Sequence, residues 1–309
     1  MTTDTERLDE ANACHDDDPA RGAELLLAID AAQLPPERWP TYAFLLNHVF
    51  GEKLGRWDDA LVHLRHLLSL AQPAPALVLW RQAATAARLA GPKALADELA
   101  LAFAQASGAP PERCDELLQL CAAMYQAPGL EVAQAGELTL AALAPLAQPP
   151  WHAPNPLDAS VAACANNLAS GLLDRPATEL RATNARAALA QSAEQAQRFW
   201  QRAGTWVQHE RALYLRTMAY NALAEPREAR AHAREALALL DTHDAEHAED
   251  VDRAFIELER WHACEHLGLS AEAQDARHAA QALADKFDDA GLTTWFEQRA
   301  AALRALPAP

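Results

Sequence analysis

A helix-pair pattern that recurs along the chain constrains its fold more than any other feature. In the clearest copy, residues 77–105, two amphipathic stretches flank a turn at Gly91 and Pro92. One such pair cannot bury its apolar face alone, so pairs of this kind stack on their neighbours. The pattern therefore predicts an array of stacked helix pairs, which offers a surface for binding rather than an enclosed reaction centre.

A small residue marks the start of the second stretch in each pair. It is an alanine in five places, at intervals typical of helical-repeat arrays: Ala23, Ala60, Ala96, Ala229 and Ala273. A small side chain at this point lets the two helices approach closely. No run of β-branched and aromatic residues alternates with polar ones, so strands are not expected. We predict an all-α fold; the alternative is an alanine-rich bundle without repeats.

Residues Trp80, Ala84, Gly91, Ala96 and Phe103 together resemble the tetratricopeptide repeat family. Partial copies of the same pattern occur at three other places: Gly55, Trp57, Ala60, Leu64 and Leu67; Asn166 to Ala169; and Leu213, Tyr220, Ala229, Ala233 and Ala236. Three residues depart from the pattern, because they stand at a repeat position where the family has a small side chain: His48, Thr217 and Trp261. The resemblance implies a right-handed α-α superhelix of about six or seven helix pairs. We expect it to end in a capping helix near residues 292–305.

The densest proline cluster predicts where the chain divides. Residues 145–156 cannot be helical throughout, because proline breaks a helix interior. We therefore expect an N-terminal half over residues 1–148, a connection over 149–156, and a C-terminal half with the capping helix over 157–309. Trp151 indicates that the connection is packed down, since a free linker rarely carries an indole.

The acidic composition narrows the classes of partner. With 26 Lys and Arg against 43 Asp and Glu, the net charge of -17 would repel phosphate backbones, which disfavours nucleic acid. The acidity favours solubility, and the alternative is attraction of a basic partner.

No run approaches the ~18 apolar residues of a membrane span. Five scattered cysteines and a polar N-terminus suggest free thiols in the cytoplasm. Abundant Ala and Arg with few Lys suggests a bacterial source.

The family resemblance implies that a protein or peptide segment binds along the first helices of the pairs, which line the concave face. Residues expected to be exposed there are Lys53, Arg81, Arg88, Asn166, Ser170, Arg211, Tyr214, Met218 and Asn221. Asparagine pairs with peptide groups and arginine clamps carboxylates. We therefore expect a non-enzymatic adaptor or chaperone-like module without a cofactor; homo-oligomers are compatible with this. A sensor that rearranges around a small peptide is a further alternative.

A second motif points to a different class of protein. Residues His243 to His247 and His262 to His266 each read H-x-x-E-H. On a helix, two histidines four residues apart can ligate one zinc ion, with the glutamate as a base. This order resembles the inverted zincin signature of some metallopeptidases. The alternative function is therefore a zinc-dependent hydrolase on a helical scaffold, although spacing identifies no third ligand.

Overall fold

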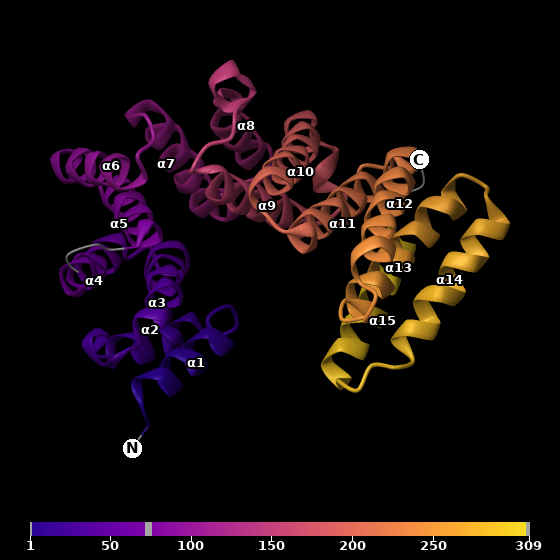
Figure 1. Cartoon of the computed structure of the whole chain (residues 1–309), viewed down its shortest axis with the longest axis horizontal. Coiled ribbons are helices and arrows are strands. Elements are labelled where there is room, and N and C mark those ends of the chain that lie inside the picture. Colours follow the sequence, from indigo (N-terminus) through magenta and orange to yellow (C-terminus); the bar gives the residue numbers. More distant parts are fainter. Residues whose placement is uncertain (1, 72–75, 307–309) are drawn as a thin grey trace. The chain divides into compact units, whose positions relative to one another are not determined.

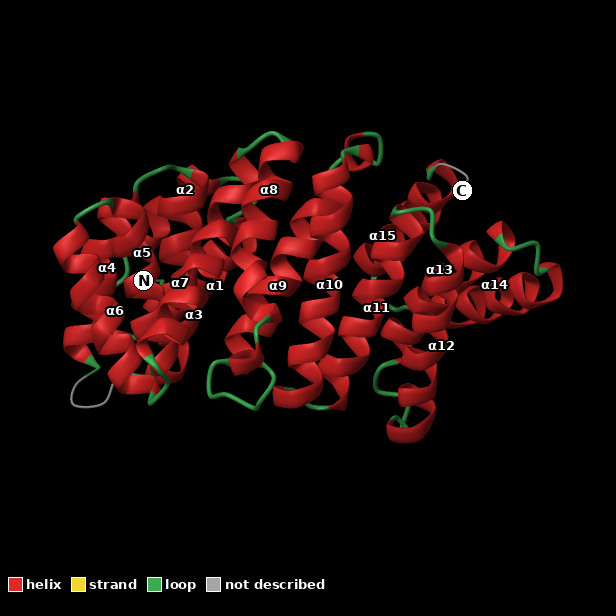
Figure 2. Cartoon of the chain, turned by 90° about the horizontal axis from the view of Figure 1, so that it is seen from above, coloured by secondary structure: helices red, strands yellow, loops and turns green. Residues whose placement is uncertain are grey.

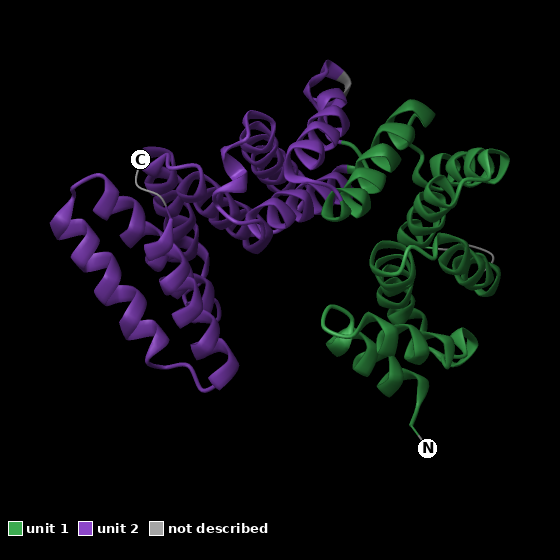
Figure 3. Cartoon of the chain, turned by 180° about the vertical axis from the view of Figure 1, so that it is seen from behind, with its two compact units in different colours: residues 1–129, 155–157 green, residues 130–154, 158–309 purple. Residues whose placement is uncertain are grey.

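The computed structural model describes residues 2–71 and 76–306, and these residues form helices and turns without any strand (Figures 1 and 2). The all-α prediction is therefore confirmed for this part of the chain. The chain divides into two compact units (Figure 3). Unit 1 comprises residues 1–129 with 155–157, and unit 2 comprises 130–154 with 158–309. Each is described separately below.

Unit 1 contains the first seven α-helices and a π-helical segment that continues the third. They are α1 (Asp4–Cys14), α2 (Pro19–Leu27), α3 (Trp39–Leu45), the π-helix η3 (Leu46–Lys53), α4 (Trp57–Leu70), α5 (Leu77–Ala90), α6 (Lys93–Ser107) and α7 (Pro111–Gln126). Helices next to one another in the chain pack together, as in the pairs α1/α2, η3/α4 and α5/α6. The α5/α6 pair matches the expected helix pair over residues 77–105.

The described residues of unit 2 form eight α-helices. They are α8 (Val132–Leu143), α9 (Asp158–Leu173), α10 (Thr183–Ala203), α11 (Trp206–Ala222), α12 (Pro226–His243), α13 (Asp250–His266), α14 (Ser270–Ala284) and α15 (Ala290–Ala305). The pairs α9/α10, α11/α12 and α13/α14 pack closely, and α15 lies against α13 at the end expected for the capping helix. Helix α8 packs mainly on α10. A Cβ atom on Gly136 of α8 would lie 2.7 Å from the backbone of Asn184, so this approach requires glycine.

Residues 149–154 of the proline-rich connection belong to unit 2, and residues 155 and 156 belong to unit 1. Trp151, in the 3₁₀ turn η6 (Pro149–Trp151), is fully buried and meets the ring of Phe199 edge-on at 5.8 Å. Arg202 donates to the Trp151 carbonyl oxygen at 2.8 Å. The division between units follows Gly129, ahead of the connection, because these contacts attach residues 149–154 to α10. The prediction that Trp151 holds this segment down is confirmed.

Left-handed residues form the turns inside four helix pairs. Gly55, Gly91 and Gly268 have φ angles of 68°, 107° and 70°, which glycine adopts without steric cost. Ala224 has a φ angle of 58° at the corresponding turn between α11 and α12. Its Cβ atom makes that conformation about 1 kcal/mol less favourable. The same backbone turn therefore recurs even where the sequence lacks the glycine.

The recurring alanines behave as the repeat predicts in four of five places. Ala23, Ala60, Ala229 and Ala273 are each at most 4% exposed near the start of a second helix. Ala96 is only half-buried, although it belongs to the copy that fits the pattern best. Close approach of the two helices is thus established at these four positions.

The buried side-chain amide of Gln82 connects three helices of unit 1, namely η3, α5 and α7. The Asn47 side chain of η3 donates to both the carbonyl oxygen and the Oε1 atom of Gln82 in α5, at 2.9 and 2.7 Å. The Tyr125 hydroxyl of α7 donates to the same Oε1 atom at 3.1 Å. Asn47 and Gln82 are at most 5% exposed. Gln82 therefore ties α5 to the helices on either side of it.

The same arrangement recurs in unit 2. The Asn221 side chain of α11 donates to the carbonyl oxygen and to Oε2 of Glu259 in α13, at 3.1 and 2.7 Å. Arg299 of α15 donates to Oε1 of Glu259 at 2.5 Å. Both Gln82 and Glu259 stand nine residues before the left-handed glycine that follows their helix. One polar position thus serves the same purpose in two pairs, as expected for an internal repeat.

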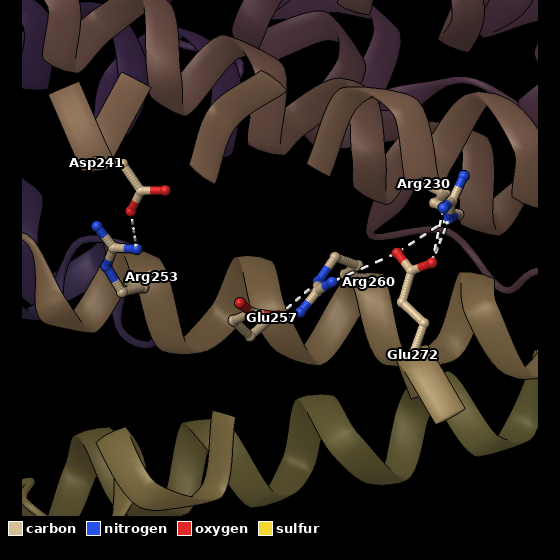
Figure 4. A network of polar contacts seen from close by, with 6 residues as sticks. All are labelled: Arg230, Asp241, Arg253, Glu257, Arg260 and Glu272. Carbon is tan, nitrogen blue, oxygen red and sulfur yellow. Dashed lines mark hydrogen bonds and ion pairs between the residues drawn. The ribbon is translucent and has the colours of Figure 1, made fainter. Parts of the chain in front are cut away.

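An ion-pair network joins α12, α13 and α14 (Figure 4). Glu272 of α14 accepts from Arg230 of α12 at 2.6 and 3.0 Å and from Arg260 of α13 at 3.4 Å. Arg260 also pairs with Glu257, and Arg253 pairs with Asp241, both at 2.7 Å. Glu272 is therefore the carboxylate at which the three helices meet.

Glu272→Gln is expected to lower the free energy of unfolding by about 1 kcal/mol at neutral pH, because it weakens two charge-assisted contacts. The bonds from Arg230 lower the pKa of Glu272. Its contribution is therefore present above the usual carboxyl pKa and is lost as the pH falls through the lowered one. Urea unfolding at neutral pH and below about pH 4 should show the difference between the two proteins shrinking in acid. A difference that does not change with pH would contradict this account.

Candidate functional site

Two of the three cations expected in unit 1 form ion pairs with the protein's own carboxylates. Lys53, at the end of η3, lies 2.8 Å from Asp16. Arg88 of α5 forms an ion pair with Asp115 of α7. Arg81 lies half-buried on α5. Lys53 and Arg88 therefore do not offer an uncompensated charge to a partner.

Arg211 of α11 is also compensated, although it is exposed. Its guanidinium donates to Asp252 at 2.7 Å and to Glu249 at 3.0 Å. The bond to Asp252 raises the pKa of Arg211. Asn166 and Ser170 lie half-buried on α9, also in unit 2. A partner that used Arg211 would have to displace two carboxylates.

Three other predicted residues of α11 are drawn into the core to different degrees. The Tyr214 ring packs against the apolar clusters around α12, α13 and α15, and burial raises the pKa of its hydroxyl. Met218 is half-buried. Asn221 is 3% exposed and bonded to Glu259, so the expectation that it is exposed is wrong. This face of α11 packs on α13, and there the Asn221 amide donates a hydrogen bond to the buried carboxylate of Glu259.

The first H-x-x-E-H copy is not helical. Helix α12 ends at His243, whose ring stacks on Trp206 at 5.6 Å. The carboxylate of Asp244 then caps the following turn by accepting from the backbone N–H groups of Ala248 and Glu249. His247 has a left-handed φ angle of 58°. The two histidines therefore do not share a helix face as the motif requires.

The second copy is helical but assembles no group of three ligands. His262 and His266 of α13 have ring centroids 4.4 Å apart. Burial lowers the pKa of His262 to about 4, which leaves its ring neutral. Among the described residues, three potential ligand atoms come together only at His15, Asp16 and His48 in unit 1. Among the described residues, neither H-x-x-E-H copy therefore comes together with a third potential ligand.

A pocket of about 550 Å³ opens between α13 and α14. We call it the α13–α14 pocket; it is lined by Trp261 and Glu265 of α13 and by Ser270, Gln274, Arg277 and His278 of α14. The short turn at Gly268 places these two helices side by side. Ala273 forms part of the wall, and its small side chain leaves the space open. The lining offers donors and acceptors of both charge signs, which suits a polar ligand.

Arg277 is the cation of this pocket. Its guanidinium lies over the Trp261 ring, 5.5 Å from the ring centroid, and its side chain is exposed. No ion pair joins it to another residue of the described ranges, in contrast to Lys53, Arg88 and Arg211. A guanidinium stacked on an indole is oriented while its N–H groups stay available. Arg277 can therefore accept a carboxylate from outside the protein.

Sequence reasoning did not find this pocket. Trp261 was noted only as a large residue in a slot expected to be small, and Arg277 stands on the second helix of its pair, away from the expected binding face. The two residues meet because α13 and α14 pack, which helical periodicity within one segment does not reveal. The misplaced tryptophan was the available signal, since a large ring there requires a partner on the next helix.

Within the described ranges, no helix combines the length and apolar character needed to cross a membrane. Helices that follow one another in the chain pack as neighbours, which is compatible with a helical repeat. No protein-family model matches the chain, and no curated protein matches it.

Proposed function

We propose that this protein is a tetratricopeptide-like helical-repeat module, superhelical in its stacking, that binds a segment of a partner protein and catalyses no reaction. The observation that carries the proposal is Arg277, an exposed cation stacked on Trp261 in the α13–α14 pocket without an ion pair in the described ranges. Stacked helix pairs supply the rigid surface that such recognition needs. The proposed site differs from the face that the sequence first suggested.

The chemistry of the pocket favours a polar peptide with an acidic group. Arg277 would take the carboxylate in two-point fashion. Glu265 and Gln274 can accept hydrogen bonds from backbone N–H groups of the bound segment. Ser270 and His278 can form further hydrogen bonds with the same segment. Because the chain has a net charge of -17, it repels an acidic segment at long range. The preference for one peptide segment over another would therefore depend on these local contacts.

Arg277→Glu is expected to weaken binding of the selected peptides by about tenfold or more, since a charge-assisted contact is replaced by repulsion. A phage-displayed library of random short peptides would be panned on the wild-type protein, and the enriched peptides would be measured by fluorescence anisotropy. We expect the enriched sequences to share an acidic residue or a free C-terminal carboxylate.

Two matched variants separate this site from the alternatives. Arg65→Glu makes the same charge change at an exposed position of α4 and should leave binding unchanged. Arg211→Glu tests the face expected from sequence. Binding that survives Arg277→Glu but is lost in Arg211→Glu would move the site to α11. Failure of the library to yield any peptide that distinguishes Arg277→Glu from wild type would reject the pocket as a peptide site.

A further inference from the structure

Two histidines and an aspartate meet in unit 1, whereas the α13–α14 pocket belongs to unit 2. His15 caps the C-terminal end of α1, and Asp16 follows it in the turn to α2. His48 lies in η3, the π-helical continuation of α3. One potential ligand atom from each residue lies within 4.8 Å of the other two. These residues come from segments about thirty positions apart, so the fold itself brings them together.

The separations match those of ligands around a small metal ion. The Nε2 atom of His48 lies 3.2 Å from one carboxylate oxygen of Asp16, and the Nε2 atom of His15 lies 3.3 Å from the other. Two ligands at zinc–nitrogen distance in a tetrahedral site stand about 3.3 Å apart. Only small side-chain movements are therefore needed for all three to contact one ion.

The other nitrogen of each ring is already occupied. The Nδ1 atom of His15 lies 2.6 Å from the carbonyl oxygen of Asn12, and the Nδ1 atom of His48 lies 2.7 Å from a carboxylate oxygen of Glu52. Both partners are acceptors, so each Nδ1 atom carries the proton. In the neutral rings both Nε2 lone pairs then face the oxygens of Asp16, an acceptor-to-acceptor contact that either a proton on Nε2 or a bound metal ion relieves. Protein ligands of metals commonly show this outer hydrogen bonding.

We propose that His15, Asp16 and His48 form a binding site for one divalent transition-metal ion, with zinc as the favoured ion and water completing the coordination. Imidazole nitrogens with a single carboxylate favour zinc and its neighbours over magnesium and calcium, which prefer oxygen ligands. Asn12 and Glu52 orient the two imidazoles. The proposal does not depend on the peptide-binding function.

The surroundings hold the rings in place for this purpose. The His48 ring stacks on Phe44 with centroids 5.4 Å apart, and it meets the ring of His15 at 5.0 Å. The wide helical turns of η3 carry both His48 and Glu52, and π-helical segments are rare and often found at functional sites. A bound ion would link the turn after α1 to η3, and so would join the first two helix pairs of unit 1.

Substitution of Lys53 tests the proposal through an expected increase in zinc affinity, where the histidine variants should decrease it. The Lys53 ammonium lies 2.8 Å from the same Asp16 oxygen that faces His48, so it competes with a metal ion for that carboxylate. Lys53→Met should therefore tighten zinc binding, although it removes an ion pair. A cluster that served only to stabilise the fold would gain nothing from this change.

The experiment is a zinc titration of the full-length protein against a chromophoric chelator. We expect one zinc ion per chain and a higher melting temperature with zinc than with excess chelator. His15→Gln and His48→Gln should each weaken affinity by more than about a hundredfold, beyond the loss typical of outer partners, and Glu52→Gln by about tenfold. Cobalt bound in place of zinc should give visible absorption bands that both histidine variants lose.

Two control variants complete the test. His66→Gln changes an exposed histidine of α4 in the same unit and should leave zinc affinity unchanged. The double variant His262→Gln/His266→Gln should also bind normally. Far-ultraviolet circular dichroism checks the fold of each variant. If a histidine variant does not fold, Asp16→Asn is used in its place, because Asp16 is exposed. Equal zinc binding by wild type and His15→Gln, or loss in the α13 double variant alone, would overturn the proposal.

Discussion

Arg299→Met is expected to lower the free energy of unfolding by about 3–5 kcal/mol, the loss typical when one partner of a buried ion pair is removed. Glu259 has no exposed surface, and Arg299 donates to it at 2.5 Å. Burial is the largest single influence and lowers the pKa of Arg299, but the charge of Glu259, its hydrogen bond and the nearby Tyr214 together raise that pKa. Without the guanidinium, Glu259 keeps only the amide of Asn221. Urea unfolding at neutral pH measures the loss.

Two further variants identify the cause of that loss. In the double variant Glu259→Gln/Arg299→Met no charge is left buried, so much of the stability should return. Arg304→Met changes an exposed arginine of the same helix and should alter stability by no more than about 0.5 kcal/mol. If Arg299→Met costs no more than Arg304→Met, then Glu259 does not depend on its cation and the tie between α13 and α15 is weak.

The helices themselves could be predicted because their signals are local. Apolar periodicity together with a turn at Gly91 and Pro92 predicted the pair α5/α6 over residues 77–105. The capping helix expected near 292–305 corresponds to α15. The superhelical arrangement of these pairs stays a prediction.

The contacts between helices could not be predicted in the same way. Ala224 forms a left-handed turn without glycine, so the glycine that marks the turns of other pairs is missing from the α11/α12 pair. Asn221 was expected on a binding face but lies against α13, because its exposure depends on which side of α11 meets the next pair. The carboxylates that neutralise Arg88 and Arg211 stand on other helices. Charge compensation of this kind is set by packing, and periodicity does not reveal it.

Glu210 should make the protein less stable as the pH rises towards about 8. It lies in α11 with no exposed surface, and neither carboxyl oxygen has a hydrogen-bond partner in the described ranges. Burial and the nearby charge of Asp252 raise its pKa to about 8 despite Arg211. An acid with a raised pKa favours folding fully below its unfolded value, 4.5, and loses that contribution as the pH rises through the folded one.

Glu210→Gln removes this titration while keeping the shape of the side chain. At about pH 9 the variant should be more stable than wild type by on the order of 4 kcal/mol, and below about pH 4 the two should be similar, because Glu210 is then neutral in both folded and unfolded chains. Urea unfolding across this range measures the difference, with Glu246→Gln, an exposed carboxyl, as the control. A gap between wild type and Glu210→Gln that is the same at both ends of the range would mean that Glu210 stays ionised, with water reaching its carboxylate.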